Sequence, residues 1–264
     1  MTKVALISDL HNELLRETGS AVPDIKLNRE VDALIMAGDI DVQEFGVRYA
    51  IRQSDLLGVP VIYVLGNHEF YETHDRPVMD KILEETGGTN VHVLDSESVV
   101  IADTLFIGAT LWTDFELFGL NSKNRVLSHA AFNSNDYYNI RLVDKPFSPV
   151  FSPTTSSIWH EADRAFIEAE LTRNYDGKKV VVTHHAPSLQ CLPVFERKDL
   201  ISACYASHLD WMIEKYQPNA WLHGHIHYPN QIQVGETTII SNPSGYPQFS
   251  DIPEFYEPLV FQIT

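Results

Sequence analysis

The chain has little cysteine, few basic side chains and no long hydrophobic run. Its 264 residues include two cysteines, Cys191 and Cys204, which are too few for a disulfide framework and match no metal-binding spacing. No apolar run approaches the ~18 residues of a membrane span, and no basic region followed by a cleavable apolar segment opens the chain. These absences predict a reduced, cytoplasmic protein that does not act at a membrane.

Positive charge is scarce as well. The chain has 19 Lys and Arg residues against 36 Asp and Glu residues, a net charge of −17 with His counted neutral. Binding of nucleic acids draws much of its affinity from Lys and Arg at phosphates, so this balance argues against a nucleic-acid partner. We expect a small-molecule substrate instead, and no motif implies a partner protein.

Hydrophobic periodicity predicts alternating strands and helices. The predicted strands are Lys3–Ser8, Ala33–Ala37, Val61–Leu65, Val91–Leu94, Val99–Ile101, Thr104–Thr110, Lys179–Thr183, Ala220–His223, Gln231–Val234, Thr237–Ser241 and Leu259–Ile263. The predicted helices are Gln43–Leu57, Arg76–Glu85, Ser157–Arg173 and Ser207–Lys215. Several of the strands are almost continuously apolar, as expected when both faces of a sheet are covered. We therefore expect one α/β domain over residues 1–264, built from two packed mixed sheets with helices outside.

Residues Trp112–Thr155 break this pattern. The stretch is rich in Asn, Ser, Pro and aromatic residues and has no sustained period. A segment of this length is often a functional lid or insertion, and within it Asn135, Tyr137 and Arg141 are candidate substrate contacts. The alternative is a surface excursion with a small aromatic cluster of its own.

Short polar segments follow the strands and carry the chemistry. They are Asp9-Leu10-His11, Gly38-Asp39, Gly66-Asn67-His68-Glu69, His184-His185 and His223-Gly224-His225-Ile226-His227. Together they hold seven of the twelve histidines and no thiolate. Because ligands gather at the carboxyl ends of strands in open α/β sheets, these donors predict a metal centre, and they are too many for one ion.

The spacing of the donors suits two ions. Asp9 and His11 are two residues apart, so in extended backbone they point to the same side, and His225 and His227 share this spacing. Asp39 is the natural bridge, because one carboxylate can give an oxygen to each of two ions. Carboxylate and imidazole donors favour Mn, Fe or Zn, as divalent or trivalent ions, over soft metals.

Two ions about 3.5–4 Å apart are typical of phosphoryl-transfer sites. A hydroxide held between them can attack phosphorus directly, so no covalent enzyme intermediate is needed. The departing alkoxide then needs a proton. His68, which adjoins Asn67 and is not required as a ligand, is the candidate donor; with Asp39 it makes up the predicted catalytic pair.

In order and spacing these motifs resemble those of the calcineurin-like metallophosphoesterases, over residues 9–227. The resemblance implies a four-layer α-β-β-α sandwich and a dinuclear site with His68 as the catalytic acid. It assigns one metal to Asp9, His11, Asp39 and His227. It assigns the other metal to Asp39, Asn67, His184 and His225.

One departure bears on the substrate. The Ser/Thr protein phosphatases of this superfamily continue the second motif to Asp-Arg-Gly, whereas here Asp39 is followed by Ile40-Asp41. Without that arginine to hold a phosphomonoester dianion, we expect a phosphoric ester hydrolase that favours phosphodiesters. The alternatives are a phosphomonoesterase acting on a small molecule or nucleotide, a catalytically weak binding module on the same fold, and a metal-dependent amide hydrolase.

Two further histidines are left open. His185 and His223 either orient a ligand or phosphate, or are simply packed in the core.

Overall fold

The computed structural model describes residues 1–71, 75–142, 151–247 and 252–264. Its central feature is a pair of sheets. The first has the strand order β13 (Leu259–Gln262), β1 (Lys3–Ile7), β3 (Ala33–Ala37), β4 (Val61–Val64) and β5 (Val91–Val93). Strand β13 runs antiparallel to β1, and the other neighbours are parallel. This sheet is mixed, as the sequence predicts.

The second sheet has six strands and is also mixed. Its order is β10 (Asn230–Val234), β11 (Thr237–Ser241), β9 (Ala220–His223), β8 (Lys178–Thr183), β7 (Thr104–Ala109) and β6 (Glu97–Ile101). The pairs β10–β11 and β6–β7 are antiparallel, and the three pairs between them are parallel. Strands β10 and β11 form a hairpin, with Gly235 at a φ of 59° in its turn.

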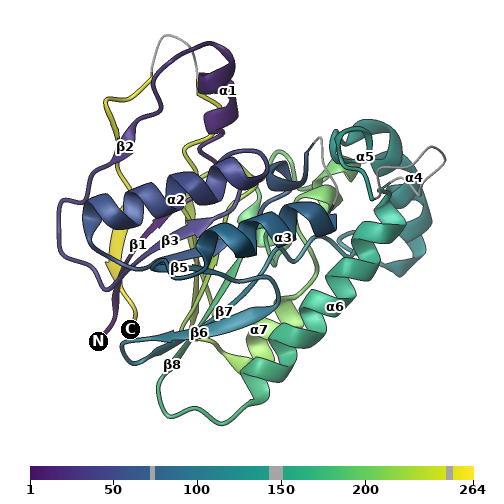
Figure 1. The fold of residues 1–264 in the computed structure, drawn as a ribbon. Helices are drawn as coiled ribbons and strands as arrows, with labels where there is room; N and C mark the ends of the chain where they lie inside the picture. The colour runs from purple at the N-terminus through teal and green to yellow at the C-terminus, as the bar shows by residue number, and fades with distance from the viewer. Residues whose placement is uncertain (72–74, 143–150, 248–251) are drawn as a thin grey trace.

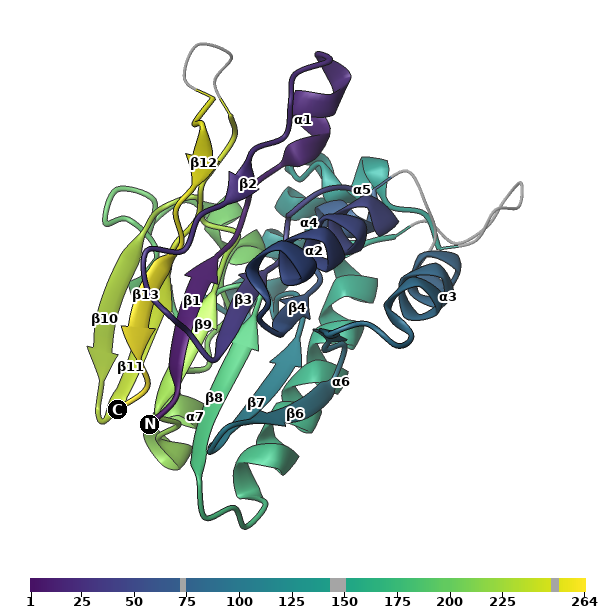
Figure 2. The same cartoon turned by 60° about the vertical axis from the view of Figure 1, so that its left-hand side comes forward.

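Helices cover the outer faces of both sheets (Figures 1 and 2). Helices α2 (Glu44–Leu57) and α3 (Asp75–Thr86) pack on the first sheet, and α6 (Pro153–Thr172) packs on β7 of the second and contacts α7 (Asp210–Tyr216). One apolar cluster lies between the sheets and includes Leu6, Ile35 and Phe106. Two more clusters lie under the helices. The four-layer α-β-β-α sandwich is therefore confirmed.

Local sequence explains where the long helices begin and end. The side chain of Ser152 caps α6 by accepting a hydrogen bond from the Thr155 amide at 3.2 Å, and Pro153 occupies the first turn. Helix α2 ends at Gly58, whose φ of 67° is left-handed and therefore favours glycine. Both helices match sequence predictions to within a few residues.

Several short elements escape sequence prediction. They are α1 (Asn12–Glu17), α4 (Lys123–Asn133), α5 (Asp136–Asn139), the paired strands β2 (Asp24–Ile25) and β12 (Phe255–Tyr256), and the 3-10 turns η1 (His68–Phe70), η2 (Leu120–Ser122), η3 (Leu189–Cys191) and η4 (Leu200–Cys204). Helix α4 buries only Val126 and Ala130, too few apolar positions to produce a visible period. It packs against η4 and α6.

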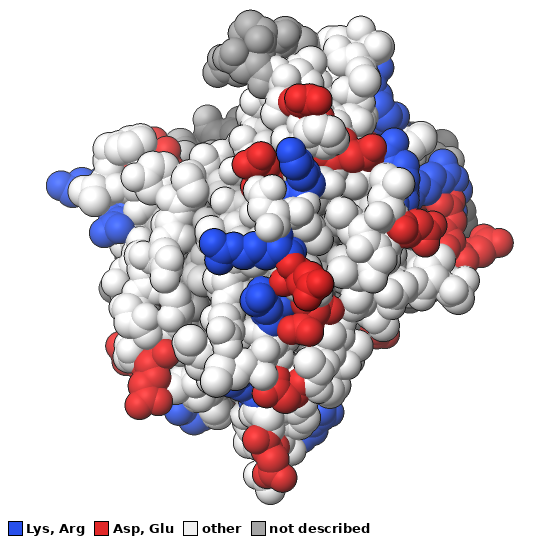
Figure 3. Space-filling model, turned by 90° about the vertical axis from the view of Figure 1, so that its left-hand side faces the viewer, with Lys and Arg blue, Asp and Glu red and all other residues white. Residues whose placement is uncertain are grey.

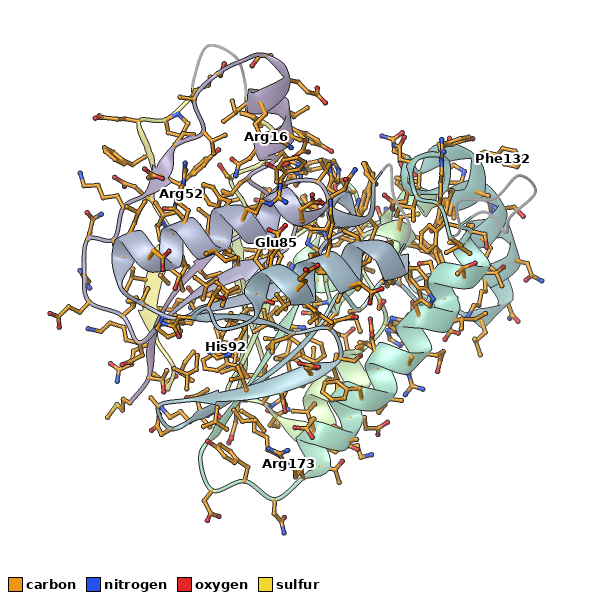
Figure 4. All side chains as sticks on the ribbon, viewed as in Figure 1. Arg16, Arg52, Glu85, His92, Phe132 and Arg173 are labelled. Carbon is orange, nitrogen blue, oxygen red and sulfur yellow. The ribbon has the colours of Figure 1, made fainter. Side chains whose placement is uncertain are left out.

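The stretch Trp112–Thr155 is thus partly helical, because α4 and α5 lie inside it; residues 143–150 lie outside the described part. On α4, Phe132 points away from the rest of the fold (Figure 4). No helix in the described part of the chain is long and apolar enough to cross a membrane.

Candidate metal centre

The polar motifs meet at one edge of the sandwich. Asp9 and Asp39 follow β1 and β3, Asn67 follows β4, His184 follows β8, and His225 lies just beyond β9. Parallel neighbours bring these strand ends together from both sheets. All five side chains belong to the set predicted from the sequence.

The backbone at several of these positions is left-handed. The residues that share a positive φ are Asp9 (54°), His11 (48°), Asp39 (54°), His225 (68°) and His227 (46°). A non-glycine residue in this region costs energy, of order 1–3 kcal/mol each, and such strain concentrates at functional sites. Adjoining glycines allow the close approach: a Cβ on Gly224 would lie 2.7 Å from the Ala37 carbonyl oxygen.

The donor atoms of the predicted ligands form two groups that share one carboxylate. We call Asp9, His11, Asp39 and His227 the first group. The second group consists of Asp39, His184 and His225, with the amide oxygen of Asn67 at 3.0 Å from His184 Nε2. Asp39 Oδ1 lies 3.4 Å from His184 Nε2, and Asp39 Oδ2 lies 3.9 Å from His11 Nε2. One oxygen of Asp39 therefore faces each group.

The chemistry of the donors in both groups fits a cation. His184 Nδ1 donates to the Ala37 carbonyl at 2.9 Å, so Nε2 presents a lone pair to the second group. His11 Nδ1 lies 3.1 Å from a carboxylate oxygen of Glu13, which leaves His11 Nε2 facing His227 Nε2 at 2.9 Å. Lone pairs that converge at these distances repel one another unless a positive charge lies among them.

The electrostatics agree with this interpretation. Burial would raise the pKa of the Asp39 carboxyl, but the histidines around it, above all His184, hold that pKa well below its usual range. Burial would lower the pKa of His184, yet Asp39 raises it to about 10. The buried cluster thus favours added positive charge, which protons supply weakly and metal ions supply strongly.

Glu13 is a residue that sequence reasoning missed. It is 6% exposed, and its Oε1 accepts from His11 Nδ1 at 3.1 Å and from His68 Nδ1 at 2.9 Å. Burial would raise the pKa of Glu13, but hydrogen bonds from the two rings lower it to about 2. One carboxylate oxygen therefore orients a candidate ligand and the candidate acid together. Its position two residues beyond His11 was the only signal in the sequence.

Glu69 joins two motif loops. Its carboxylate accepts from the backbone amides of Asp39 at 3.1 Å, Ile40 at 2.9 Å and Gly66 at 2.7 Å, and from the Tyr63 hydroxyl at 2.7 Å. Burial and the Asp39 charge raise the pKa of Glu69 to about 7. The four hydrogen-bond donors nevertheless favour the ionised form of Glu69. If Glu69 were protonated, its own O–H hydrogen would point toward one of these donor hydrogens.

The remaining predicted residues lie in different places. Of the candidates from Trp112–Thr155, Asn135 lines a cavity of about 260 Å³ that also includes Asn67 and His68. Tyr137 is buried in the core and stacks on Phe151, with ring centroids 5.4 Å apart. Arg141 is exposed and is not among the described residues that line the cavity.

His185 and His223 are both fully enclosed. His185 Nδ1 lies 3.2 Å from the Thr110 carbonyl oxygen, and its ring lies 4.3 Å from that of His225. His223 Nδ1 lies 3.0 Å from the Gly224 carbonyl oxygen, and its buried Nε2 has no hydrogen-bond partner among the described residues. Burial lowers the pKa of both rings, to about 4 for His223, so both are neutral.

Fold and site together define an α/β protein of two facing sheets with a candidate metal centre at their edge. The family model of the calcineurin-like phosphoesterases matches residues 2–229. The chain therefore belongs to this family. No curated protein matches the sequence.

One solved structure shares this fold, and a second is a more distant match. The phosphopantetheinyl hydrolase from Mycobacterium tuberculosis is 21% identical, with a TM-score of 0.64 over 93% of this chain and 90% of that one. A putative 5′-nucleotidase from Staphylococcus aureus is 14% identical, with a TM-score of 0.45 over 91% of this chain and 48% of that one.

Proposed function

We propose that the protein is a dinuclear metal-dependent phosphoesterase that hydrolyses small phosphodiesters. The observation that carries this proposal is the pair of donor groups with Asp39 between them. Two bound divalent ions would neutralise phosphate oxygens and make water a nucleophile near neutral pH. Family membership supports the reaction class, and Mn, Fe and Zn all suit these nitrogen and oxygen ligands.

The surroundings of His68 support its proposed role as the acid. Its ring lines the cavity, its Nδ1 lies 2.9 Å from Glu13 Oε1, and its Nε2 lies 4.0 Å from Asp39 Oδ2. With Nδ1 bonded to Glu13, Nε2 is free to carry the proton that the leaving alkoxide takes as the phosphorus–oxygen bond breaks. Burial would lower the pKa of His68, but Asp39 and Glu13 raise it to about 9, which favours the protonated ring.

The composition of the cavity favours a diester. None of the described residues that line it is Lys or Arg, so apart from a protonated His68 no side-chain cation there matches the second charge of a phosphomonoester dianion. Arg16 of α1 (Figure 4) pairs with Asp41 instead, its Nε 2.9 Å from Oδ2. A phosphodiester carries one negative charge and needs less compensation.

Surface charge favours a small substrate over a nucleic acid. On the face in Figure 3, basic and acidic side chains are interspersed among uncharged residues, and no broad basic area appears there. The net charge of −17 adds a repulsive background for a polyanion.

The direct test compares two chromogenic esters in added Mn²⁺, with EDTA as the control. We expect bis-p-nitrophenyl phosphate to be hydrolysed with a higher kcat/KM than p-nitrophenyl phosphate. A clear preference for the monoester would contradict the diester assignment. Activity on acylated amines with none on either phosphate would instead indicate an amide hydrolase.

A second test concerns His68. The variant His68→Ala should slow alkyl esters, whose leaving groups need a proton, by about 10²–10⁴-fold, and should slow p-nitrophenyl esters much less. Equal losses on both substrates would remove His68 from the acid role.

A further inference from the structure

A buried carboxylate outside the polar motifs contacts one of the candidate ligands. Asp136 of α5 is 5% exposed, and its Oδ1 accepts from Asn67 Nδ2 at 2.8 Å and from the Tyr71 hydroxyl at 2.7 Å. Asp136 lies 69 positions from Asn67 in the sequence, in the connection between β7 and β8. Nothing in the motifs points to this contact.

The contact decides which way the Asn67 amide faces. A carboxylate accepts hydrogen bonds and an amide NH2 group donates them, so the NH2 group of Asn67 must face Asp136. The amide oxygen is then turned to the opposite side, where it lies 3.0 Å from His184 Nε2 in the second group. With the amide reversed, two oxygens would face each other beside Asp136, and the NH2 group would face the metal position.

We propose that Asp136 is a positioning residue that holds the Asn67 amide oxygen toward the metal of the second group. This inference rests on the proposed function, because it requires that group to bind an ion. Tyr71 supports the arrangement: its hydroxyl lies 3.3 Å from Asn67 Nδ2, and its ring stacks on His68 with centroids 4.2 Å apart.

The residues just before Asp136 also form part of the wall of the proposed substrate cavity. Asn133, Ser134 and Asn135 line the cavity beside Asp136, and the Ser134 hydroxyl donates to Asp136 Oδ2 at 3.1 Å. Residues that would touch a substrate are therefore tied to a residue that orients a metal ligand. Residues 133–136 thereby belong to the metal centre as well as to its border.

The test is calorimetric titration of the metal-free protein with Mn²⁺. We expect two binding events for the wild type. In Asp136→Ala one of the two should weaken by about 10- to 100-fold, the usual effect of removing a group that orients a metal ligand. Asp136→Asn keeps an acceptor oxygen for Asn67 and should restore most of the affinity. The matched control is Tyr138→Ala, which removes an exposed side chain from the same helix and should leave both events unchanged.

A double variant separates orientation from general damage to the fold. If Asp136 acts through Asn67, then Asp136→Ala should cause no further loss of Mn²⁺ affinity in an Asn67→Ala background. Unchanged affinities in Asp136→Ala, or an Asp136→Asn variant as weak as Asp136→Ala, would overturn the inference. A wild type that binds fewer than two ions would instead overturn the dinuclear function itself.

Discussion

The two donor groups differ in what holds their ligands. In the first group, His11 is oriented by Glu13, a side chain two residues away in the sequence. In the second group, His184 is oriented by the main-chain oxygen of Ala37, and Asn67 by Asp136 from a distant helix. The first group can therefore be disturbed through one local side chain. In the second group, no side-chain substitution can release His184, because its partner is a main-chain oxygen. Asn67, in contrast, depends on the side chain of Asp136.

The largest effect is expected from replacing Asp39, the carboxylate that the two groups share. Asp39→Asn would leave one acceptor oxygen and no charge where each group now has a carboxylate oxygen. Loss of an outer partner typically costs 10–100-fold in metal affinity, so loss of the bridge should cost more than about 100-fold for both ions together. Calorimetry and metal analysis after dialysis check this. A variant that still holds two ions tightly would show that the bridge is misassigned.

A smaller effect should separate the groups. Glu13→Ala removes the acceptor that orients both His11 and His68, and should weaken the ion of the first group by about 10- to 100-fold while sparing the second. It should also slow alkyl esters more than p-nitrophenyl esters. Glu13→Gln keeps an acceptor oxygen and should lie close to wild type, and Glu17→Ala on the exposed side of the same helix is the control. Equal weakening of both ions would mean that the groups are not held independently.

Asp163, a buried carboxylate outside both donor groups, should make the stability of the protein depend on pH. Burial raises the pKa of Asp163 to about 7, against an ordinary value of 3.8 when unfolded. Its stabilising contribution is therefore complete below about pH 4 and is lost as the pH rises through about 7. Asn does not ionise, so the variant Asp163→Asn should not show this loss. As the pH rises from 5 to 8, the free energy of unfolding of the variant should therefore increase by on the order of 2 kcal/mol relative to that of the wild type. Urea unfolding with EDTA present at both pH values measures this; a difference independent of pH would contradict it.

The smallest expected effect concerns the cavity wall. Asn135 lines the cavity and Arg141 does not, although both come from the same stretch of sequence. Asn135→Ala should raise KM for a diester by about 3- to 10-fold, the equivalent of one hydrogen bond, with little change in kcat. Arg141→Ala should leave both constants unchanged. A larger effect at Arg141 than at Asn135 would place the substrate outside this cavity.

Prediction from sequence succeeded where the signal is local. The apolar runs before Asp9, Asp39 and His184 identify strands because their residues are buried on both faces, and the polar residues that end those runs fall at one edge of the sandwich. It failed for α4, which buries only two residues, and for Glu13 and Asp136, whose carboxylates resemble any surface acid until their partners are known.

The sequence by itself determined the two mixed sheets, the order of the motifs and the kinds of donor atom, because periodicity and residue type are properties of neighbours along the chain. Tertiary structure alone decided that Asp136 reaches Asn67 and that Tyr137 faces the core while Asn135 faces the cavity. These outcomes depend on how helices far apart in sequence pack together. The sequence of a short helix with few buried residues has no hydrophobic pattern that indicates which elements it packs against.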